Sequence, residues 1–233
     1  GLILTMGVLT AMGAGTCSFS VLLSAAAQRM PAESRGVSSG IINAGGSFGQ
    51  FVFAPIIQKL IQGFGWMGTM WSMAAVALLA IPLLNRLTSD THAPVKAPDP
   101  EGGLKKAVRD AVHNPSYLLL HLGFFTCGFH IAFLVTHLPT EVGLCGLSPE
   151  VASWSLAIIG LANIAGSLYA GSCINSYRSK YILAFMYTSR AVLITVYLLA
   201  PKTEWTFYAF ALGLGFTWLA TVPPTAALVG KLF

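Results

Sequence analysis

The sequence predicts an all-α protein that crosses a membrane several times. Of its 233 residues, 55% are hydrophobic and only 9% are charged, and the mean hydropathy is +0.71. Soluble domains carry about a quarter of their residues as charged side chains. Most of this surface is therefore expected to face lipid, and seven apolar stretches are long enough to span a bilayer as helices.

The predicted spans follow one another with short gaps, except after the third. They are Leu2 to Ala27, Ser38 to Ile61, Trp66 to Leu84, Tyr117 to Leu138, Val151 to Ile174, Tyr181 to Ala200 and Thr206 to Leu228. The fourth and fifth have defined beginnings, because Asn114-Pro115 and Ser148-Pro149 place a capping residue before a first-turn proline. In the seventh, Pro223-Pro224 removes backbone hydrogen bonds and is expected to kink the helix.

A polar segment divides the chain into three predicted parts. Residues 1–84 are expected to form the last three helices of one bundle, residues 85–113 a linker, and residues 114–233 the first four helices of a second bundle. Because the sequence begins and ends close to apolar segments, it is expected to be an internal piece of a larger protein.

The basic residues predict the sidedness of these spans. Ten lie in gaps on one side: Arg29, Arg35, Arg86, Lys96, Lys105, Lys106, Arg109, Arg178, Lys180 and Lys231. The gaps on the other side hold Lys202 together with Glu141, Glu150 and Glu204. By the positive-inside rule the linker is cytoplasmic and Gly1 lies near the outer face. Basic residues spread in this way do not form a nucleic-acid-binding face.

The stretch from Gln28 to Gly68 carries the most specific pattern. Arg35 is followed by Gly40, Ala44-Gly45 and Gly49, in the order G-x-x-x-A-G-x-x-x-G, and small residues at such spacings let membrane helices approach closely. With the linker and the next four spans, this pattern resembles helices four to ten of the twelve in the major facilitator superfamily. Within the superfamily it is most similar to the monocarboxylate-transporter-like branch, which includes bacterial organic-anion exchangers.

The resemblance implies a secondary active carrier that moves a small organic solute by alternating access. The expected solute is a monocarboxylate or related organic anion, coupled to protons or exchanged, as in a symporter or an antiporter. The full-length protein is expected to be a multi-pass monomer in the lipid bilayer of a bacterial inner membrane. A carrier or efflux protein for a neutral small molecule is the alternative. A seven-helix receptor or retinal pump is less favoured, because the last span has no mid-membrane lysine for a Schiff base and the long linker after the third span divides the helices as in a two-bundle transporter.

Two polar side chains in the fifth span predict part of a solute site. Asn163 and Ser167 lie one helical turn apart, on one face. In the resembled branch the first position commonly holds an acidic or amide residue, and the second an arginine that pairs with a substrate carboxylate. Ser167 cannot supply that charge-assisted pair, which keeps the neutral solute open. Hydrogen bonding between helices is the competing structural interpretation of both residues.

Three further candidates lie in other spans. His130 is near the middle of the fourth, where an imidazole can bind an anion or relay a proton. Arg190, at the centre of the sixth, can supply the missing positive charge or pair with carbonyls or Tyr187. Trp218 in the seventh can contact or gate the solute, or serve as a packing residue.

No enzymatic, cofactor or metal site is predicted. Cys17, Cys127, Cys145 and Cys173 lack metal-ligand spacing and are expected to be packing residues. The run from Gly36 to Gly40 contains two serines, but no histidine partner for a nucleophile can be identified nearby.

Overall fold

The computed structural model describes residues 3–9, 12–13, 22, 35–79, 82 and 103–232. Within these ranges the chain is helical and contains no strand. Five helical segments are long and apolar enough to cross a membrane. The predicted fold class, a helical membrane protein, is confirmed. The first predicted span lies mostly outside the described residues, of which Ile3–Leu9 form the π-helix η1.

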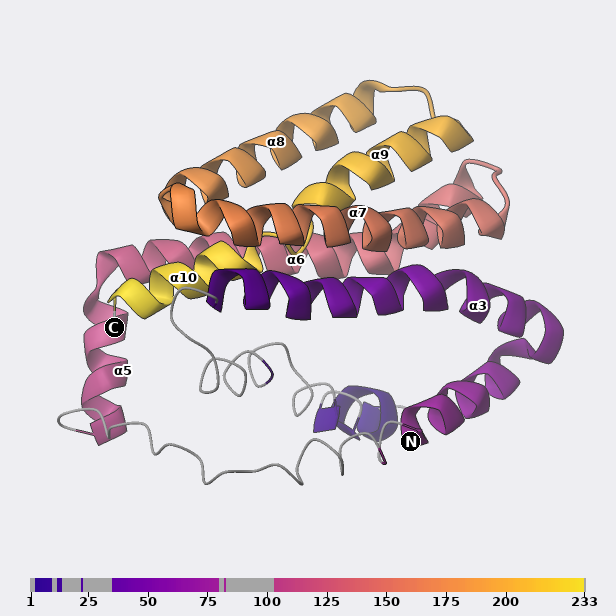
Figure 1. The fold of residues 1–233 in the computed structure, drawn as a ribbon. Coiled ribbons are helices and arrows are strands. Elements are labelled where there is room, and N and C mark those ends of the chain that lie inside the picture. Colours follow the sequence, from indigo (N-terminus) through magenta and orange to yellow (C-terminus); the bar gives the residue numbers. More distant parts are fainter. Residues whose placement is uncertain are drawn as a thin grey trace.

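Helix α3 (Arg35–Leu78) holds the second and third predicted spans. The helix is interrupted at Gly65, which has φ 68° and ψ −179°, a conformation that residues with a Cβ rarely adopt. Figure 1 shows α3 turning sharply beyond its long first part. The boundary predicted between two spans is therefore a kink centred on one glycine.

The second half of the chain forms helices α6 (Pro115–Leu144), α7 (Pro149–Ser176), α8 (Ser179–Leu199), α9 (Glu204–Thr217) and α10 (Val222–Leu232). Asn114 caps α6 as predicted, because its Oδ1 accepts from the backbone N–H of Ser116 at 2.9 Å. Ser148 precedes α7, but its side chain makes no capping bond. The kink predicted at Pro223-Pro224 is confirmed as a break, since α9 ends at Thr217 and α10 begins at Val222.

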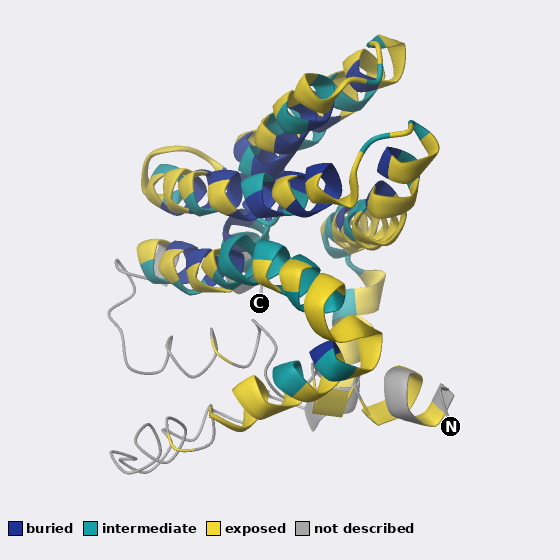
Figure 2. Ribbon diagram, turned by 90° about the vertical axis from the view of Figure 1, so that its right-hand side faces the viewer, coloured by how far each residue is buried: buried dark blue, intermediate teal, exposed yellow. Residues whose placement is uncertain are grey.

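Helix α7 is the centre of the packing. It lies between the first part of α3 on one side and α9 on the other, with α6 behind and α8 beyond α9 (Figure 1). Buried residues concentrate along α7 and on the helix faces turned toward it (Figure 2). Many large apolar side chains remain exposed on the outer faces, among them Trp71, Phe125 and Leu199. In a spanning helix, such side chains contact lipid rather than water.

The glycine pattern of α3 meets its neighbour at only one of the predicted positions. A Cβ on Gly40 would lie 2.8 Å from the carbonyl oxygen of Ser167, so the backbones of α3 and α7 touch there. Gly45 and Gly49 have no atom within 4 Å of such a Cβ. Close approach of α3 to α7 is therefore found at Gly40, and for Gly45 and Gly49 the predicted packing role stays a prediction.

The predicted linker contains a helix that was not expected from the sequence. Helix α5 (Gly103–His113) precedes α6 and runs across the direction of the spans at one end of the bundle (Figure 1). Val108 and Val112 are each 53% exposed, and Lys106 and Arg109 are exposed as well. A short amphipathic helix in this orientation fits the interface between headgroups and water.

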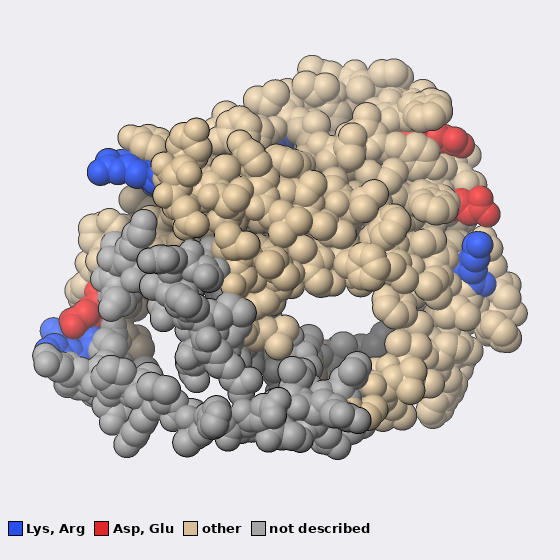
Figure 3. Space-filling view, viewed as in Figure 1, with Lys and Arg blue, Asp and Glu red and all other residues tan. Residues whose placement is uncertain are grey.

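Charged side chains gather toward the two ends of the helices, and the visible face between them is largely uncharged (Figure 3). The end with α5 and the turn between α7 and α8 carries Lys106, Arg109, Arg178 and Lys180 with Asp110. The other end carries Glu141, Glu150 and Glu204 with Lys59 and Lys202. The asymmetry found along the sequence is thus an asymmetry between the ends of the fold. That the basic end faces the cytoplasm stays a prediction.

Candidate functional site

Helices α3 and α7 are joined by a row of buried hydrogen bonds between uncharged side chains. Asn43 Nδ2 donates to Ser167 Oγ at 2.6 Å, and Asn163 Nδ2 donates to Ser47 Oγ at 2.5 Å. All four side chains are nearly excluded from the surface, with exposures between 0% and 5%. We call Asn43, Ser47, Asn163 and Ser167 the polar seam. It links the part of the chain before the linker to the part after it.

The sequence builds this seam by placing small and polar residues at helical spacing. Asn43 and Ser47 are four residues apart on α3, and Asn163 and Ser167 are four apart on α7, so each pair shares one face. Close approach is possible because Gly160 faces α3, where a Cβ would lie 2.7 Å from the carbonyl oxygen of Ser47. The two helices run antiparallel, since the earlier residue on one meets the later residue on the other.

The seam continues into the break between α9 and α10. Asn43 Nδ2 also donates to the carbonyl oxygen of Leu219 at 3.0 Å, and the N–H of Leu219 donates to Asn163 Oδ1 at 2.9 Å. Inside a membrane, backbone groups freed by a helix break need partners from the protein. The two asparagines satisfy both polar groups of Leu219.

Arg190 satisfies the other side of the same break. Its Nη2 donates to the carbonyl oxygens of Thr217 and Trp218, the latter at 2.8 Å. Its Nη1 donates to Cys127 Sγ at 3.5 Å, and its Nε has no partner. The side chain is 1% exposed. This is the pairing with carbonyls that the structural interpretation of Arg190 predicted, and the positive charge lies at the negative end of the α9 dipole.

The remaining predicted site residues are distributed around this centre. Asn163 and Ser167 belong to the seam, and Trp218 ends α9 with its side chain buried in the apolar core. His130, on α6, has a buried Nδ1 atom without a hydrogen-bond partner and lies within electrostatic range of Arg190. Four of the five candidates thus lie in or directly beside the break and the seam.

Three participants were not singled out from the sequence: Asn43, Ser47 and Cys127. The first two are polar residues in an apolar span, which usually face the protein interior. Their polarity in an apolar span could have identified them, but the glycines of the same helix were interpreted only as sites of backbone packing. Cys127 was expected to be a packing residue; it is 2% exposed, and its Sγ lies 3.3 Å from Thr221 Oγ1.

A cleft of about 460 Å³ lies beside the seam, between α3, α6 and α7. Its walls are mostly apolar, and its polar side chains are Gln50, Gln58 and Ser153. Gln50 Nε2 donates to the carbonyl oxygen of Leu156, which fixes one edge of the cleft to α7. None of the five predicted site residues lines it. The cleft contains no charged side chain and is suited to a weakly polar or apolar group.

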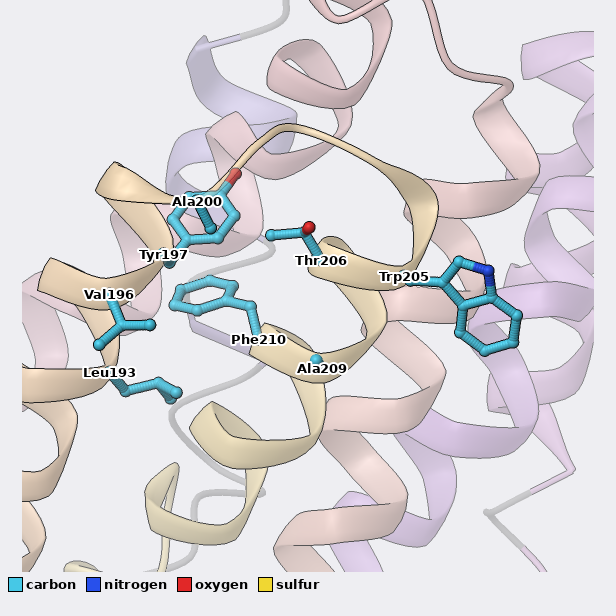
Figure 4. A pocket seen from close by; sticks show the side chains of 8 residues that line it. All are labelled: Leu193, Val196, Tyr197, Ala200, Trp205, Thr206, Ala209 and Phe210. Atoms are coloured by element: carbon cyan, nitrogen blue, oxygen red, sulfur yellow. The ribbon is translucent and has the colours of Figure 1, made fainter.

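A second cavity, of about 360 Å³, lies between the ends of α8 and α9 and is apolar (Figure 4). Tyr197 and Phe210 stack there at 4.1 Å between ring centroids, while the Trp205 ring points away from them. Tyr197 donates its hydroxyl to Glu141 Oε1 at 2.7 Å, which ties α8 to the end of α6. This cavity is therefore part of the packing at the acidic end of the bundle.

The described residues include no group of three or more histidine, cysteine or acidic side chains able to hold a metal ion.

Comparison with known proteins identifies relatives along the whole chain. A family model described as Major Facilitator Superfamily matches residues 1–233. The MFS transporter asaE of Aspergillus flavus is 23% identical over 233 residues, covering 99% of this chain and 51% of that protein. Monocarboxylate transporter 12 of Xenopus laevis is 25% identical over 196 residues, covering 73% and 41%, and that of Rattus norvegicus is 21% identical over 211 residues, covering 76% and 43%. No solved structure matches. The chain spans about half the length of the curated relatives it matches.

Proposed function

Because this chain belongs to the major facilitator superfamily, we propose that it forms part of a secondary active carrier for a small organic solute. The proposal concerns the full-length protein, since the chain spans about half of its relatives. Such carriers work by alternating access, in which two helical bundles rock against one another around a central site.

The polar seam is the observation that carries the proposal. It joins helices on either side of the linker through hydrogen bonds between uncharged groups. Interhelical bonds of this kind contribute about 0.6 kcal/mol each in a membrane, so they can be broken and remade during a transport cycle. An ionic contact at the same place would oppose that movement more, because separation would leave charges unpaired in the membrane.

We propose an organic anion, such as a monocarboxylate, as the first solute class. Two of the similar proteins are named monocarboxylate transporter 12. Arg190 is a buried cation without a carboxylate partner among the described residues, and its Nε is unpaired. His130 lies within its electrostatic range and offers a second nitrogen. Proton coupling or exchange would then involve the same pair, because an imidazole titrates near neutral pH.

A neutral small molecule is the second solute class that we propose, and a different observation supports it. The cleft between α3, α6 and α7 is lined by glutamine, serine and apolar side chains. Ser167 donates or accepts hydrogen bonds but brings no charge, and in the seam it is engaged by Asn43. A solute that binds in the cleft would therefore be recognised by hydrogen bonds and apolar contact alone.

The multi-pass membrane location follows from the spans and the family. The relatives named above are fungal and vertebrate proteins, so the expected bacterial inner membrane gains no support from them. We propose a cell membrane with the linker in the cytoplasm, and a monomer as the working unit.

Counterflow into proteoliposomes containing the full-length protein tests the function and separates the solute classes. Labelled lactate, pyruvate, oxalate and formate form one set, and sugars and amino acids the other. Accumulation driven by the unlabelled solute inside the vesicle is expected for a member of the first set. Accumulation only in the second set would replace the anion by a neutral or zwitterionic solute. If no solute of a broad panel is accumulated, the carrier proposal is wrong.

A further inference from the structure

We propose that the backbone of Leu219, through its N–H and its C=O, is a latch between the two predicted bundles, and that Asn43 and Asn163 are the positioning residues that hold it closed. The inference rests on the proposed carrier function, because it assigns these residues a role in the movement between states. It goes beyond that function by naming the element whose arrangement changes.

In the latch, two side-chain amides hold the backbone N–H and C=O of one residue, Leu219. The carbonyl oxygen of Leu219 accepts from Asn43 Nδ2 at 3.0 Å, and its N–H donates to Asn163 Oδ1 at 2.9 Å. One amide comes from α3, before the linker, and the other from α7, after it. Asn43 is 5% exposed and Asn163 is fully buried, so water cannot replace either partner.

The break makes these backbone groups available. Pro223 and Pro224 lack the N–H groups that would bond the carbonyls of Leu219 and Ala220 in a continuous helix. The chain therefore cannot return to a regular helix when an external partner is lost. The carbonyl oxygen of Leu219 also accepts from the backbone N–H of Val222 at 3.0 Å, so Asn43 is its second donor. The N–H of Leu219 depends on Asn163, and without that partner it must reorient, since an unpaired backbone group in hydrocarbon is strongly unfavourable.

The latch connects α3, which precedes the linker, to the helix break between α9 and α10, whose other carbonyls are bonded by residues that follow the linker. Arg190 and Cys127 hold the neighbouring carbonyls of Thr217 and Trp218 from α8 and α6, which follow the linker. Asn43 is the described side chain that reaches the break from α3. The same Nδ2 group also bonds Ser167, so withdrawal of α3 releases the seam and the break together. Movement of one bundle is thereby coupled to the orientation of α10.

The native thiol of Cys127 can report this event. Its Sγ is buried against the break, 3.3 Å from Thr221 Oγ1. In the full-length protein in proteoliposomes, with the other cysteines replaced by serine, the rate of alkylation by N-ethylmaleimide measures how often this region opens. Asn43→Ala and Asn163→Ala are each expected to raise that rate about fivefold to tenfold, as expected for the loss of two interhelical hydrogen bonds.

Ser47→Ala is the matched control. It removes the seam partner of Asn163 but no bond to Leu219, so alkylation is expected to stay within about threefold of the parent protein, the effect of one such bond. The double variant Asn43→Ala/Asn163→Ala is expected to react at most about twice as fast as the faster single variant, because both side chains restrain the backbone of the same residue, Leu219. If Asn43→Ala does not give a monodisperse protein, Asn43→Leu removes the same donor without introducing a charge and keeps a side chain of similar size.

A solute-dependent readout separates a latch from a merely structural bond. In the parent protein, a transported solute is expected to change the alkylation rate of Cys127, and in Asn43→Ala that response is expected to be lost. Equal acceleration by Ser47→Ala, no acceleration by either asparagine variant, or an intact solute response in Asn43→Ala would overturn the latch. If the parent protein shows no counterflow, the carrier function is contradicted instead. The alkylation rates measured without solute do not depend on that function and still test the bonds to Leu219.

Discussion

Replacing Gly160 with alanine tests whether the close approach of α3 and α7 is required for the polar seam. A Cβ at this position would lie 2.7 Å from the carbonyl oxygen of Ser47 and 2.8 Å from the backbone nitrogen of Phe51. Both neighbours are backbone atoms, so they cannot yield by changing a side-chain rotamer. An ordinary contact begins near 3.4 Å, which requires the helices to separate by about 0.7 Å.

That separation can be followed through the hydrogen bonds. The distance from Asn163 Nδ2 to Ser47 Oγ would grow from 2.5 Å to about 3.2 Å, and the bond survives in weakened form. The distance from Gln50 Nε2 to the carbonyl of Leu156 would grow from 3.1 Å to about 3.8 Å, and that bond is lost. With the overpacking itself, the expected destabilisation is about 1–3 kcal/mol.

Thermal denaturation of the full-length protein in detergent, followed by size-exclusion fluorescence, measures the effect. The melting temperature of Gly160→Ala is expected to fall by about 5 °C, and counterflow is expected to decrease. Gly128→Ala is the control, because nothing lies within 4 Å of a Cβ on Gly128 in the middle of α6. Its melting temperature is expected to change by less than about 1 °C. An unchanged melting temperature for Gly160→Ala would refute the packing argument.

Three further changes have defined outcomes. Arg190→Met leaves the carbonyl of Thr217 without its donor and that of Trp218 with the Cys127 thiol as its weak donor, and it is expected to cost about 2–4 kcal/mol; a melting temperature equal to that of the parent would show that the carbonyls find other partners. Gly65→Ala, at φ 68°, is expected to cost about 1–2 kcal/mol in the same assay, and Gly63→Ala, with open space around it, is its control. A bimane label on Val108→Cys is expected to be quenched by lipid that carries a spin label near the headgroups. The same label on Glu204→Cys tests for quenching at the opposite end of the bundle. If the label at position 108 is not quenched, α5 does not lie at the interface.

Features set by local chemistry were predictable from the sequence. The N-cap at Asn114 and the break before Pro223-Pro224 depend on a few adjacent residues, and both are observed. The pairing of Arg190 with carbonyls followed from the cost of an isolated charge in a membrane. Each of these needed no knowledge of which helix lies beside which.

Features that depend on helix neighbours were not predictable in the same way. The glycines of α3 occupy more than one face, and only packing selects Gly40 rather than Gly45 as the point of contact. Asn43 needed the position of α7 and of the break before its two acceptors could be named. Helix α5 was hidden because its short apolar stripe lies in a segment whose overall composition is polar.

The way Arg190 is compensated bears directly on how an anion would be bound. Two carbonyl oxygens and the negative end of the α9 dipole neutralise much of its charge, and both belong to the helix break. An anion that reaches the unpaired Nε would compete with these carbonyls for the same guanidinium. Any weakening of their bonds loosens the end of α9, next to the backbone groups that Asn43 and Asn163 hold. Solute binding at Arg190 and release of the break are therefore expected to favour one another, because a favourable coupling between two events acts in both directions.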